Sequence, residues 1–347
     1  MENKKLKNPS VAVIGAGMTG ILMAIKLREA GITDITILEK ADKLGGTWRE
    51  NTYPGVACDV PAHMYTYSFC GNPEWEHRFA HGDEIQAYFE KVSAEYGVTE
   101  QIRFNESLDQ SHYEDGKWKL LTSKGNRLEV DFVVAATGIL HHPAYPDIKG
   151  MDSFKGDMWH TARWNHDVDL TGKRVGIIGT GSTSTQIIAD VAEKVGHLTV
   201  FQRTPQWVFN IPDRNYTEEH KARLRGNQKL MTKISDRYAF VMRNTFSKAV
   251  TGNKFAHAVI SWMTKRNLRK SVRDPELRAK LTPDYNVGCK RLIFSSKFYD
   301  AIQRENVFLE TTGIDRISEG GVVVEGGQEH ELDVLIIATG FHPFSFM

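Results

Sequence analysis

The stretch VAVIGAGMTGILMAIKLREA, residues 11–30, decides the fold. Four β-forming residues (VAVI) precede the glycine loop GAGMTG, and a helical pattern then runs to Ala30. The next β-rich run, DITILE, ends at Glu39. A strand, a glycine-rich loop, a helix and a second strand in this order predict a parallel-sheet unit that binds a dinucleotide.

Each glycine of this first loop has its own steric role. Gly15 permits the tight turn, Gly17 lets the backbone approach a pyrophosphate, and Gly20 lets the helix pack against the strand. The start of the helix offers unpaired N–H groups and a positive dipole end to the phosphates. Glu39 suits a ribose hydroxyl, which indicates a dinucleotide without a 2′-phosphate; FAD and NAD both fit.

The same layout occurs a second time. The first copy continues with a hairpin-like stretch, 118–130, and the strand DFVVAATG, which ends at Gly138. The second copy opens with RVGIIGTGSTS at 174–184 and closes with DVLIIATG, which ends at Gly340. The sequence therefore predicts an α/β protein with two Rossmann-like domains.

The second copy, with the loop GTGSTS, departs from the first at two points, one in the loop and one at the end of the following strand. Ser184 replaces the third glycine, a change that a small residue can absorb at a helix–strand contact. Where the first copy has an acid at the strand end, the second has Arg203 followed by Thr204. A guanidinium and a hydroxyl suit a 2′-phosphate, which favours NADPH over NADH. An ordinary surface arginine is the alternative.

These patterns predict three regions. We expect an FAD-binding domain over 1–145, to which 341–347 return, an NADP-binding domain over 146–205 and 286–340, and a helical insertion over 206–285. Residues 217–281 hold 16 Lys and Arg against 5 Asp and Glu, an excess of 11 positive charges. A solvated outer face explains this excess, and an anionic membrane surface or a charged partner is the alternative.

Composition excludes several classes of protein. The net charge of the 347 residues is +1, so no strong field attracts nucleic acid. The three cysteines, Cys58, Cys70 and Cys289, form no CxxC motif, which argues against a disulfide reductase or a zinc site and for a reduced, cytoplasmic protein. We expect no metal site and, because no apolar run is long enough, no membrane span.

Two further motifs give the chain a family resemblance. One is GxWxxxxYPGxxxD, matched by Gly46, Trp48, Tyr53, Pro54, Gly55 and Asp59. The other is FxGxxxHTxxWP, matched by Phe154, Gly156, His160, Thr161 and Trp164, with Asn165 in place of the last proline. With FQRTPQW (201–207) and PDYNVGCKR (283–291), these motifs make the chain resemble the type I Baeyer–Villiger monooxygenases, which are class B flavoprotein monooxygenases.

The resemblance implies roles for individual residues. Glu39 would hold the FAD ribose, His160 would belong to a linker that couples domain motion to turnover, and Arg291 would lie beside the flavin ring, oriented by Asp59. The residues expected around the flavin are Thr47, Trp48, Asp59 and Tyr65. The NADP pyrophosphate would lie on Thr180, Gly181, Ser182, Thr183 and Gln186, and the 2′-phosphate on Arg203, Thr204 and Lys290.

The implied reaction uses NADPH and O₂ to insert one oxygen next to a ketone carbonyl, giving an ester or lactone through a flavin C4a-peroxide. A fixed guanidinium at Arg291 would favour the deprotonated peroxide, which attacks the carbonyl. Flavin N-hydroxylation or sulfoxidation is an alternative reaction. The family normally continues well beyond the strand that ends at Gly340, so a shortened dinucleotide-binding protein without turnover is a further alternative.

Overall fold

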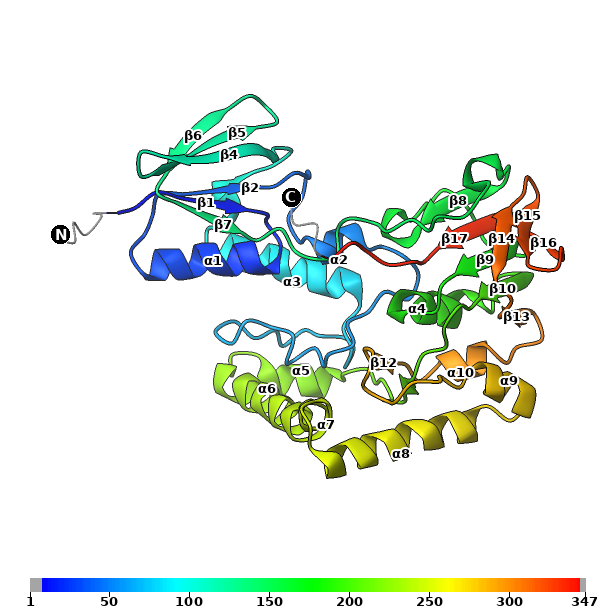
Figure 1. Ribbon diagram of the computed structural model, residues 1–347. Helices are drawn as coiled ribbons and strands as arrows, with labels where there is room; N and C mark the ends of the chain where they lie inside the picture. Colours follow the sequence, from blue (N-terminus) through cyan, green and yellow to red (C-terminus); the bar gives the residue numbers. More distant parts are fainter. Residues whose placement is uncertain (1–7, 344–347) are drawn as a thin grey trace. The chain divides into compact units, whose positions relative to one another are not determined.

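The computed structural model describes residues 8–343 of the chain (Figure 1). Contacts divide the chain into two compact units. The first comprises 1–50, 82–142 and 341–347, and the second comprises 51–81 and 143–340. The two units are described separately below. The last four residues, which the sequence assigns to the FAD domain, lie outside the described residues.

A four-stranded parallel sheet, ordered β3-β2-β1-β7, forms the centre of the first unit. Helices α1 and α3 pack together, and α1 also packs against β1. A separate antiparallel sheet has the order β4-β5-β6. The elements are β1 (Val11–Ile14), α1 (Met18–Glu29), β2 (Ile35–Leu38), α2 (Thr47–Glu50), α3 (Gly82–Glu95), η1 (Thr99–Gln101), β3 (Ile102–Arg103), β4 (Leu108–Glu114), β5 (Lys117–Thr122), β6 (Arg127–Val130) and β7 (Phe132–Ala135).

Side-chain alternation explains why β1 lies between two layers. Ala12 and Ile14 pack with Leu38 against Leu120 and Val130 of the antiparallel sheet. The residues between them in the strand point to the opposite face, because successive strand residues alternate in direction. The VAVI run is therefore buried on both faces, as expected for a parallel strand covered on both sides.

The second unit repeats this plan with a larger parallel sheet, ordered β13-β10-β9-β17-β8. A three-stranded antiparallel sheet, β14-β15-β16, again accompanies it. The elements outside the helical insertion are η2 (Met151–Ser153), β8 (Asp157–His160), η3 (Thr161–Arg163), β9 (Arg174–Ile178), α4 (Ser182–Val191), β10 (His197–Phe201), β11 (Val208–Phe209), β12 (Ile293–Phe294), α10 (Phe298–Ala301), β13 (Val307–Glu310), β14 (Ile314–Ile317), β15 (Gly321–Val324), β16 (Glu329–Glu331) and β17 (Val334–Ile337). The predicted pair of Rossmann-like folds is confirmed.

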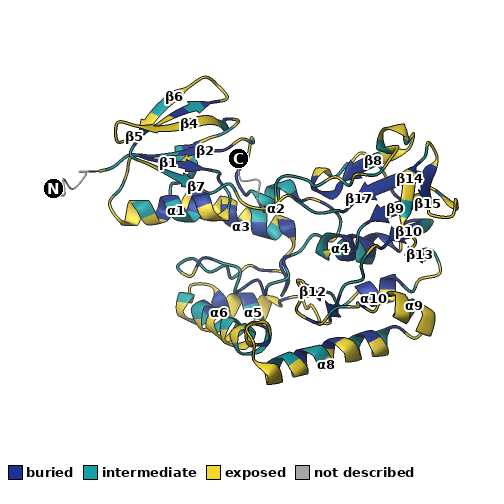
Figure 2. Ribbon diagram, in the orientation of Figure 1, coloured by how far each residue is buried: buried dark blue, intermediate teal, exposed yellow. Residues whose placement is uncertain are grey.

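The strand β17 shows how the core of this unit is divided. Val334 and Ile336 belong to a cluster with residues of α4, whereas Leu335 and Ile337 belong to a cluster with Val322 and other residues of the antiparallel sheet. The central parallel strands β9, β10 and β17 are almost wholly buried, whereas the edge strands β8 and β13 are partly exposed (Figure 2). One sheet face therefore packs on helices and the other on the β-meander.

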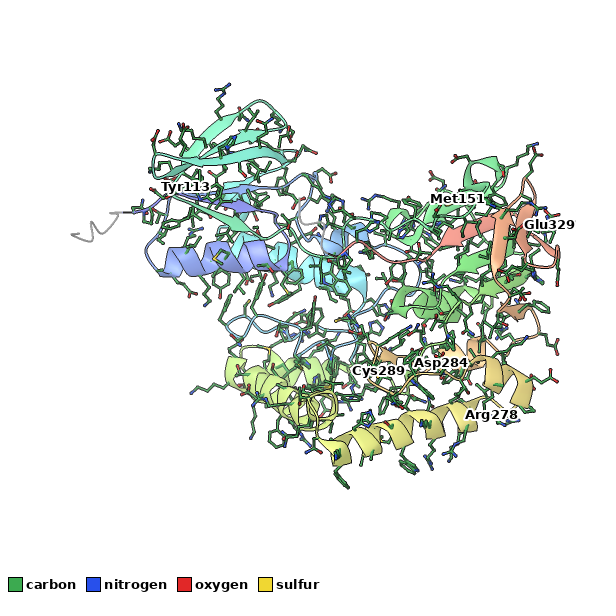
Figure 3. The ribbon with its side chains drawn as sticks, in the orientation of Figure 1. Tyr113, Met151, Arg278, Asp284, Cys289 and Glu329 are labelled. Atoms are coloured by element: carbon green, nitrogen blue, oxygen red, sulfur yellow. The ribbon has the colours of Figure 1, made fainter. Side chains whose placement is uncertain are left out.

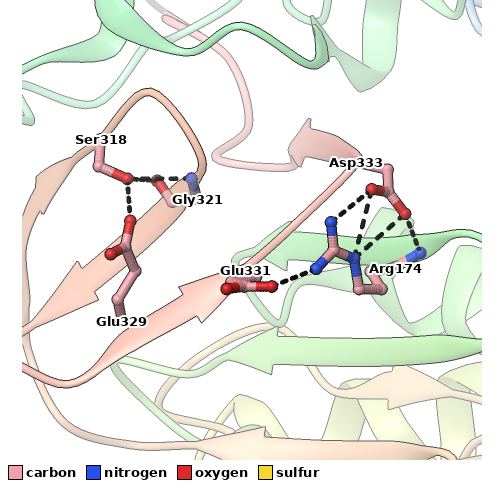
Figure 4. A network of polar contacts seen from close by, with 6 residues as sticks. All are labelled: Arg174, Ser318, Gly321, Glu329, Glu331 and Asp333. Atoms are coloured by element: carbon pink, nitrogen blue, oxygen red, sulfur yellow. Dashed lines mark hydrogen bonds and ion pairs between the residues drawn. The ribbon is translucent and has the colours of Figure 1, made fainter.

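An exposed ion-pair network joins the parallel sheet to the antiparallel sheet of the second unit (Figure 4). The Arg174 guanidinium lies 2.7 Å from the Asp333 carboxylate and 2.5 Å from that of Glu331. The backbone N–H of Arg174 also donates to Asp333, at 2.8 Å. These bonds connect the start of β9 to the turn between β16 and β17. Because the side chains are largely exposed, each pair contributes little to stability.

Within 206–285, where a helical insertion is predicted, the described chain is mainly helical. Its elements are α5 (Glu218–Leu224), α6 (Gln228–Met242), the π-helical turn η4 (Arg243–Ser247), α7 (Lys248–Val250), α8 (Lys254–Ser271) and α9 (Pro275–Lys280). Much of α8 is exposed (Figure 2), including Trp262 at 57% of its surface. Among the described residues, no helix combines the length and the apolar character that a bilayer-spanning segment requires.

Candidate functional site

The first glycine loop has the geometry that its sequence predicts. Gly15 has a φ of +104°, and a Cβ there would lie 2.6 Å from the carbonyl oxygen of Ala136 at the end of β7. A Cβ on Gly20 would lie 1.9 Å from the carbonyl oxygen of Gly15. Gly17 precedes α1, and no side chain caps this helix. The first turn of α1 therefore keeps N–H groups for a ligand.

Glu39 lies buried beside this loop, with 4% of its surface exposed. Its carboxylate accepts hydrogen bonds from the backbone N–H groups of Ala16, at 2.8 Å, and Ala41, at 3.0 Å. A Cβ added to Gly46 would lie 3.2 Å from the Cα of Gly17, so the second glycine segment packs directly on the first. Helix α2, with the predicted flavin neighbours Thr47 and Trp48, begins immediately after it.

The second glycine loop uses the same turn. Gly179 has a φ of +113°, and a Cβ there would lie 2.5 Å from the carbonyl oxygen of Ala338 at the end of β17. Ser184, which replaces the third glycine, is fully buried and donates its hydroxyl to the carbonyl of Gly179 at 2.7 Å. Gly181 precedes α4 without a side-chain cap, and a Cβ on it would meet nothing within 4 Å.

A hydrogen bond connects this loop to the residues predicted for the 2′-phosphate. The Thr180 hydroxyl donates to the carbonyl of Thr204 at 2.8 Å, which places the loop next to the end of β10. Arg203 is exposed, and within residues 8–343 it forms no ion pair. Its guanidinium is therefore available to an anionic group.

Lys290 approaches the same segment through an aromatic residue. Its ammonium lies 4.8 Å from the centroid of the Tyr285 ring. The Tyr285 hydroxyl in turn lies within hydrogen-bond distance of two acceptors, the Gln206 side-chain oxygen at 2.9 Å and the Pro205 carbonyl at 3.1 Å, and can donate its proton to either. Tyr285 thus connects Lys290 to the chain that follows Arg203, a link that was not predicted from the sequence.

The second half of the GxWxxxxYPGxxxD motif belongs to the second unit and docks on α4. The Tyr53 hydroxyl donates to the Gln186 side chain at 2.9 Å, and the Gln186 amide donates to the carbonyl of Ala57 at 2.9 Å. A Cβ on Gly55 would lie 2.9 Å from the carbonyl oxygen of Gln186, so only glycine allows this approach. Burial raises the pKa of Tyr53, partly offset by a hydrogen bond with Thr183, and keeps the phenol protonated.

Asp59 and Arg291, the predicted catalytic pair, are in contact. Their side chains form an ion pair of 2.5 Å, and the arginine side chain is 70% exposed, against 18% for the aspartate. This hydrogen bond raises the pKa of Arg291, an effect to which the Tyr65 side chain adds. The structure therefore brings Asp59 and Arg291 together, and Tyr65 influences the charge of the pair. Neighbouring Cys58 is buried, which raises the pKa of its thiol to about 12.

The linker motif has a structural role in the second unit. His160 is fully buried at the end of β8, and its Nδ1 accepts the backbone N–H of Ala162 at 3.1 Å. Burial lowers the pKa of His160, opposed by a backbone hydrogen bond with Gly340. Asn165, which stands in place of the family's proline, accepts the N–H of Asp167 at 3.0 Å and so forms a turn of its own.

The predicted site residues therefore form two groups, one in each unit. The first group surrounds the first glycine loop, and the second extends from the second loop to the Asp59–Arg291 pair. Tyr53, Ser184 and Tyr285 were missed as positioning residues. For Tyr53 the motif was the available signal, and for Ser184 it was the position of the third glycine in the loop, although its bond to Gly179 was not predicted. No local pattern announces Tyr285, because it acts through residues about 80 positions away in the sequence.

Comparisons with known proteins agree with this geometry. The profile of the flavin-binding monooxygenase-like family matches residues 8–347. An uncharacterized monooxygenase of Mycobacterium tuberculosis is 45% identical over 97% of this chain and 68% of its own length. A Baeyer–Villiger monooxygenase of Streptomyces coelicolor is 42% identical over 96% of this chain and 64% of its own length. The chain thus spans about two thirds of these relatives.

Solved structures show the same fold. The open crystal structure of cyclohexanone monooxygenase matches with a TM-score of 0.85 and 29% identity, over 97% of this chain and 74% of that one. Oxidized steroid monooxygenase bound to NADP matches with a TM-score of 0.85 and 31% identity, over 96% of this chain and 71% of that one. The chain therefore belongs to the flavin-binding monooxygenase-like family, and within it is similar to the type I Baeyer–Villiger monooxygenases.

Proposed function

We propose that this chain carries the FAD and NADPH sites of a Baeyer–Villiger monooxygenase. In the overall reaction a ketone, O₂, NADPH and a proton give an ester or lactone, water and NADP⁺. One of the two oxygen atoms enters the bond next to the carbonyl, and the nicotinamide supplies the electrons that reduce the other to water.

The single observation that supports two dinucleotide sites concerns the helix N-termini. In the insertion, α5, α6, α8 and α9 are capped by the side chains of Thr217, Asn227, Asn253 and Asp274. Helices α1 and α4 begin after Gly17 and Gly181 and have no side-chain cap. The short helices α7 and α10 lack a side-chain cap as well. The N-termini of α1 and α4 differ from these because each follows a glycine loop, where pyrophosphate oxygens would accept the N–H groups.

The residues at the two strand ends assign the cofactors. The buried Glu39 carboxylate would repel a 2′-phosphate, so the first loop suits FAD. Exposed Arg203 would attract such a phosphate, with Thr204 and Lys290 nearby, so the second loop suits NADPH. When bound, the flavin supplies the activation of O₂ with electrons from the nicotinamide.

The role that we assign to Arg291 follows from its chemistry and its partner. A guanidinium stays charged over the whole working pH range, and its bond to Asp59 raises its pKa further. Held in one orientation by that carboxylate, it would stabilise negative charge that develops during oxygen transfer. It is not needed for hydride transfer from the nicotinamide.

Replacing Arg291 tests this proposal. In stopped-flow measurements, Arg291→Ala should still allow NADPH to reduce the flavin, while ester formation from a ketone falls about 100-fold or more. Arg291→Lys should recover little of the activity, because an ammonium lacks the planar fork. Arg304→Ala, which removes an exposed arginine of the same unit that pairs with Glu193, is the matched control. Ester formation by Arg291→Ala at the parent rate would refute the assigned role.

A further inference from the structure

A pocket of about 550 Å³ lies within the second unit, between α8, α9 and the turn that follows α9. Its size is in the range of small-molecule sites. Figure 3 labels Arg278 on α9 and Asp284 on the following turn. None of the residues proposed for FAD or NADPH lines this pocket. It is therefore a further candidate ligand site, independent of the proposed function.

Unpaired positive charge dominates the walls of the pocket. Lys265, Arg269 and Arg278 line it, against a single carboxylate, Asp284, which leaves a net charge of +2. Within the part of the chain that the structure describes, none of these three cations forms an ion pair. Lys265 and Arg269 are four residues apart on α8, a spacing at which like charges destabilise a helix. An anion between them would remove this repulsion.

The floor of the pocket is aromatic and rigid. Trp207, with 4% of its surface exposed, lines the pocket and donates its indole N–H to the carbonyl of Tyr285 at 2.8 Å. The Lys265 ammonium lies 5.9 Å from the centroid of the indole ring. Leu268 and Pro283 add apolar surface. Because Trp207, Leu268 and Pro283 are largely buried, they form a narrow apolar floor, which the edge of an aromatic ring could contact beside the cations.

We propose that this pocket binds an aromatic phosphomonoester, with the phosphate between Lys265, Arg269 and Arg278 and the ring against Trp207. A phosphate dianion matches the net charge of the walls, and guanidinium groups bind its oxygens in pairs. This assignment also gives a use to part of the excess positive charge of the helical insertion, which neither dinucleotide site requires.

Isothermal titration of the full chain with 1-naphthyl phosphate tests the proposal. We expect saturable binding at one site, at least tenfold tighter than that of inorganic phosphate or of the neutral 1-naphthalenemethanol, because each of these lacks half of the ligand. The double variant Lys265→Gln with Arg269→Gln should weaken binding at least tenfold. Lys270→Gln, which removes an exposed charge from the same helix outside the pocket, should leave it within about twofold.

A second titration in saturating NADP⁺ separates this site from the nicotinamide site. Unchanged affinity for 1-naphthyl phosphate supports the proposal, whatever the outcome of the Arg291 experiment. Competition by NADP⁺ would overturn it, since the probe would then occupy the nicotinamide site. The absence of binding, or equal binding by the double variant with an unchanged melting temperature, would overturn it as well.

Discussion

The two glycine loops begin with the same turn and end differently. At the first position, Gly15 and Gly179 both have a positive φ, and a side chain on either would strike the carbonyl at the end of a neighbouring strand. At the third position the first loop has Gly20, where a Cβ would lie 1.9 Å from a carbonyl oxygen, whereas the second loop has Ser184, whose hydroxyl bonds the corresponding carbonyl at 2.7 Å.

This difference shows that the helix can approach the carbonyl of the first loop glycine at two distances. In the first loop the helix approaches so closely that no side chain fits. In the second loop the helix lies far enough away for a hydroxyl to bridge the gap. A GxGxxG pattern therefore specifies a turn and an uncapped helix, while its last position reports only the local separation of helix and loop.

The largest effect expected from this comparison is that of Gly20→Ala. Because the added methyl group would overlap a backbone carbonyl, which cannot move aside as a side chain can, we expect a loss of at least about 3 kcal/mol in the free energy of unfolding. Urea denaturation followed by circular dichroism measures it. A variant as stable as the parent would show that the first loop can open as the second one has.

Two alanine variants provide matched controls for that experiment. A Cβ on Gly17 would only touch Gly46 at 3.6 Å, and one on Gly181 would meet nothing within 4 Å. Both variants should therefore keep the parent stability. Each should weaken the dinucleotide that we propose for its own loop, FAD for Gly17→Ala and NADPH for Gly181→Ala, because the methyl group would stand between the backbone and the pyrophosphate.

The second prediction contrasts the pH dependence of the two units. In the second unit, burial and then the neighbouring His220 lower the pKa of His63 to about 4. An unfolded histidine titrates near 6.5, so the unfolded state binds a proton first as the pH falls. The free energy of unfolding is therefore not reduced by this histidine above about pH 6.5, and it decreases by up to about 3 kcal/mol as the pH falls towards 4. His63→Gln should flatten this pH dependence, whereas His112→Gln, at an exposed histidine in the first unit, should not.

The first unit should respond only in stronger acid. Hydrogen bonds from Lys117 and Ser10 lower the pKa of Asp131 to about 2, so its contribution is present above about pH 4 and is lost as the pH falls through 2. Hydrogen exchange, read separately on peptides of each unit between pH 7 and 4, should therefore show loss of protection in the second unit and little change in the first. Equal loss of protection in the two units over this interval would contradict the contrast.

Whether a feature could be predicted from the sequence depends on how far apart along the chain the contacting residues lie. The strand at 11–14, the helix that ends near Ala30 and the hairpin at 118–130 depend on neighbours in the sequence, and all were predicted correctly. The docking of Tyr53 on Gln186 depends on residues more than 130 positions apart. No periodicity reports such a contact, so residues 51–81, which are grouped with the second unit, were predicted to belong to the FAD-binding domain.

The third prediction concerns the opposite residues at the two strand ends. Arg203→Ala should weaken NADPH by about 2–3 kcal/mol and leave NADH little changed, because only NADPH has the 2′-phosphate that the guanidinium would hold. The Michaelis constants for the two nicotinamides measure this difference. Arg316→Ala, at an exposed arginine of the same unit that pairs with Asp315, is the control. An equal effect on both nicotinamides would reverse the assignment of the second loop.

The smallest expected effect is that of Ser184→Ala, and it tests the comparison most directly. This change keeps the Cβ and removes only the hydroxyl, so the Gly179 carbonyl loses one hydrogen bond in a buried place. We expect a cost of about 1 kcal/mol in the free energy of unfolding, with both dinucleotide affinities unchanged. Ser184→Gly should cost somewhat more, because glycine also destabilises a helix interior. If Ser184→Ala instead weakened NADPH as strongly as Gly181→Ala does, the hydroxyl would be shaping the phosphate site. The serine would then have to be assigned to cofactor binding and not to the spacing of helix and loop.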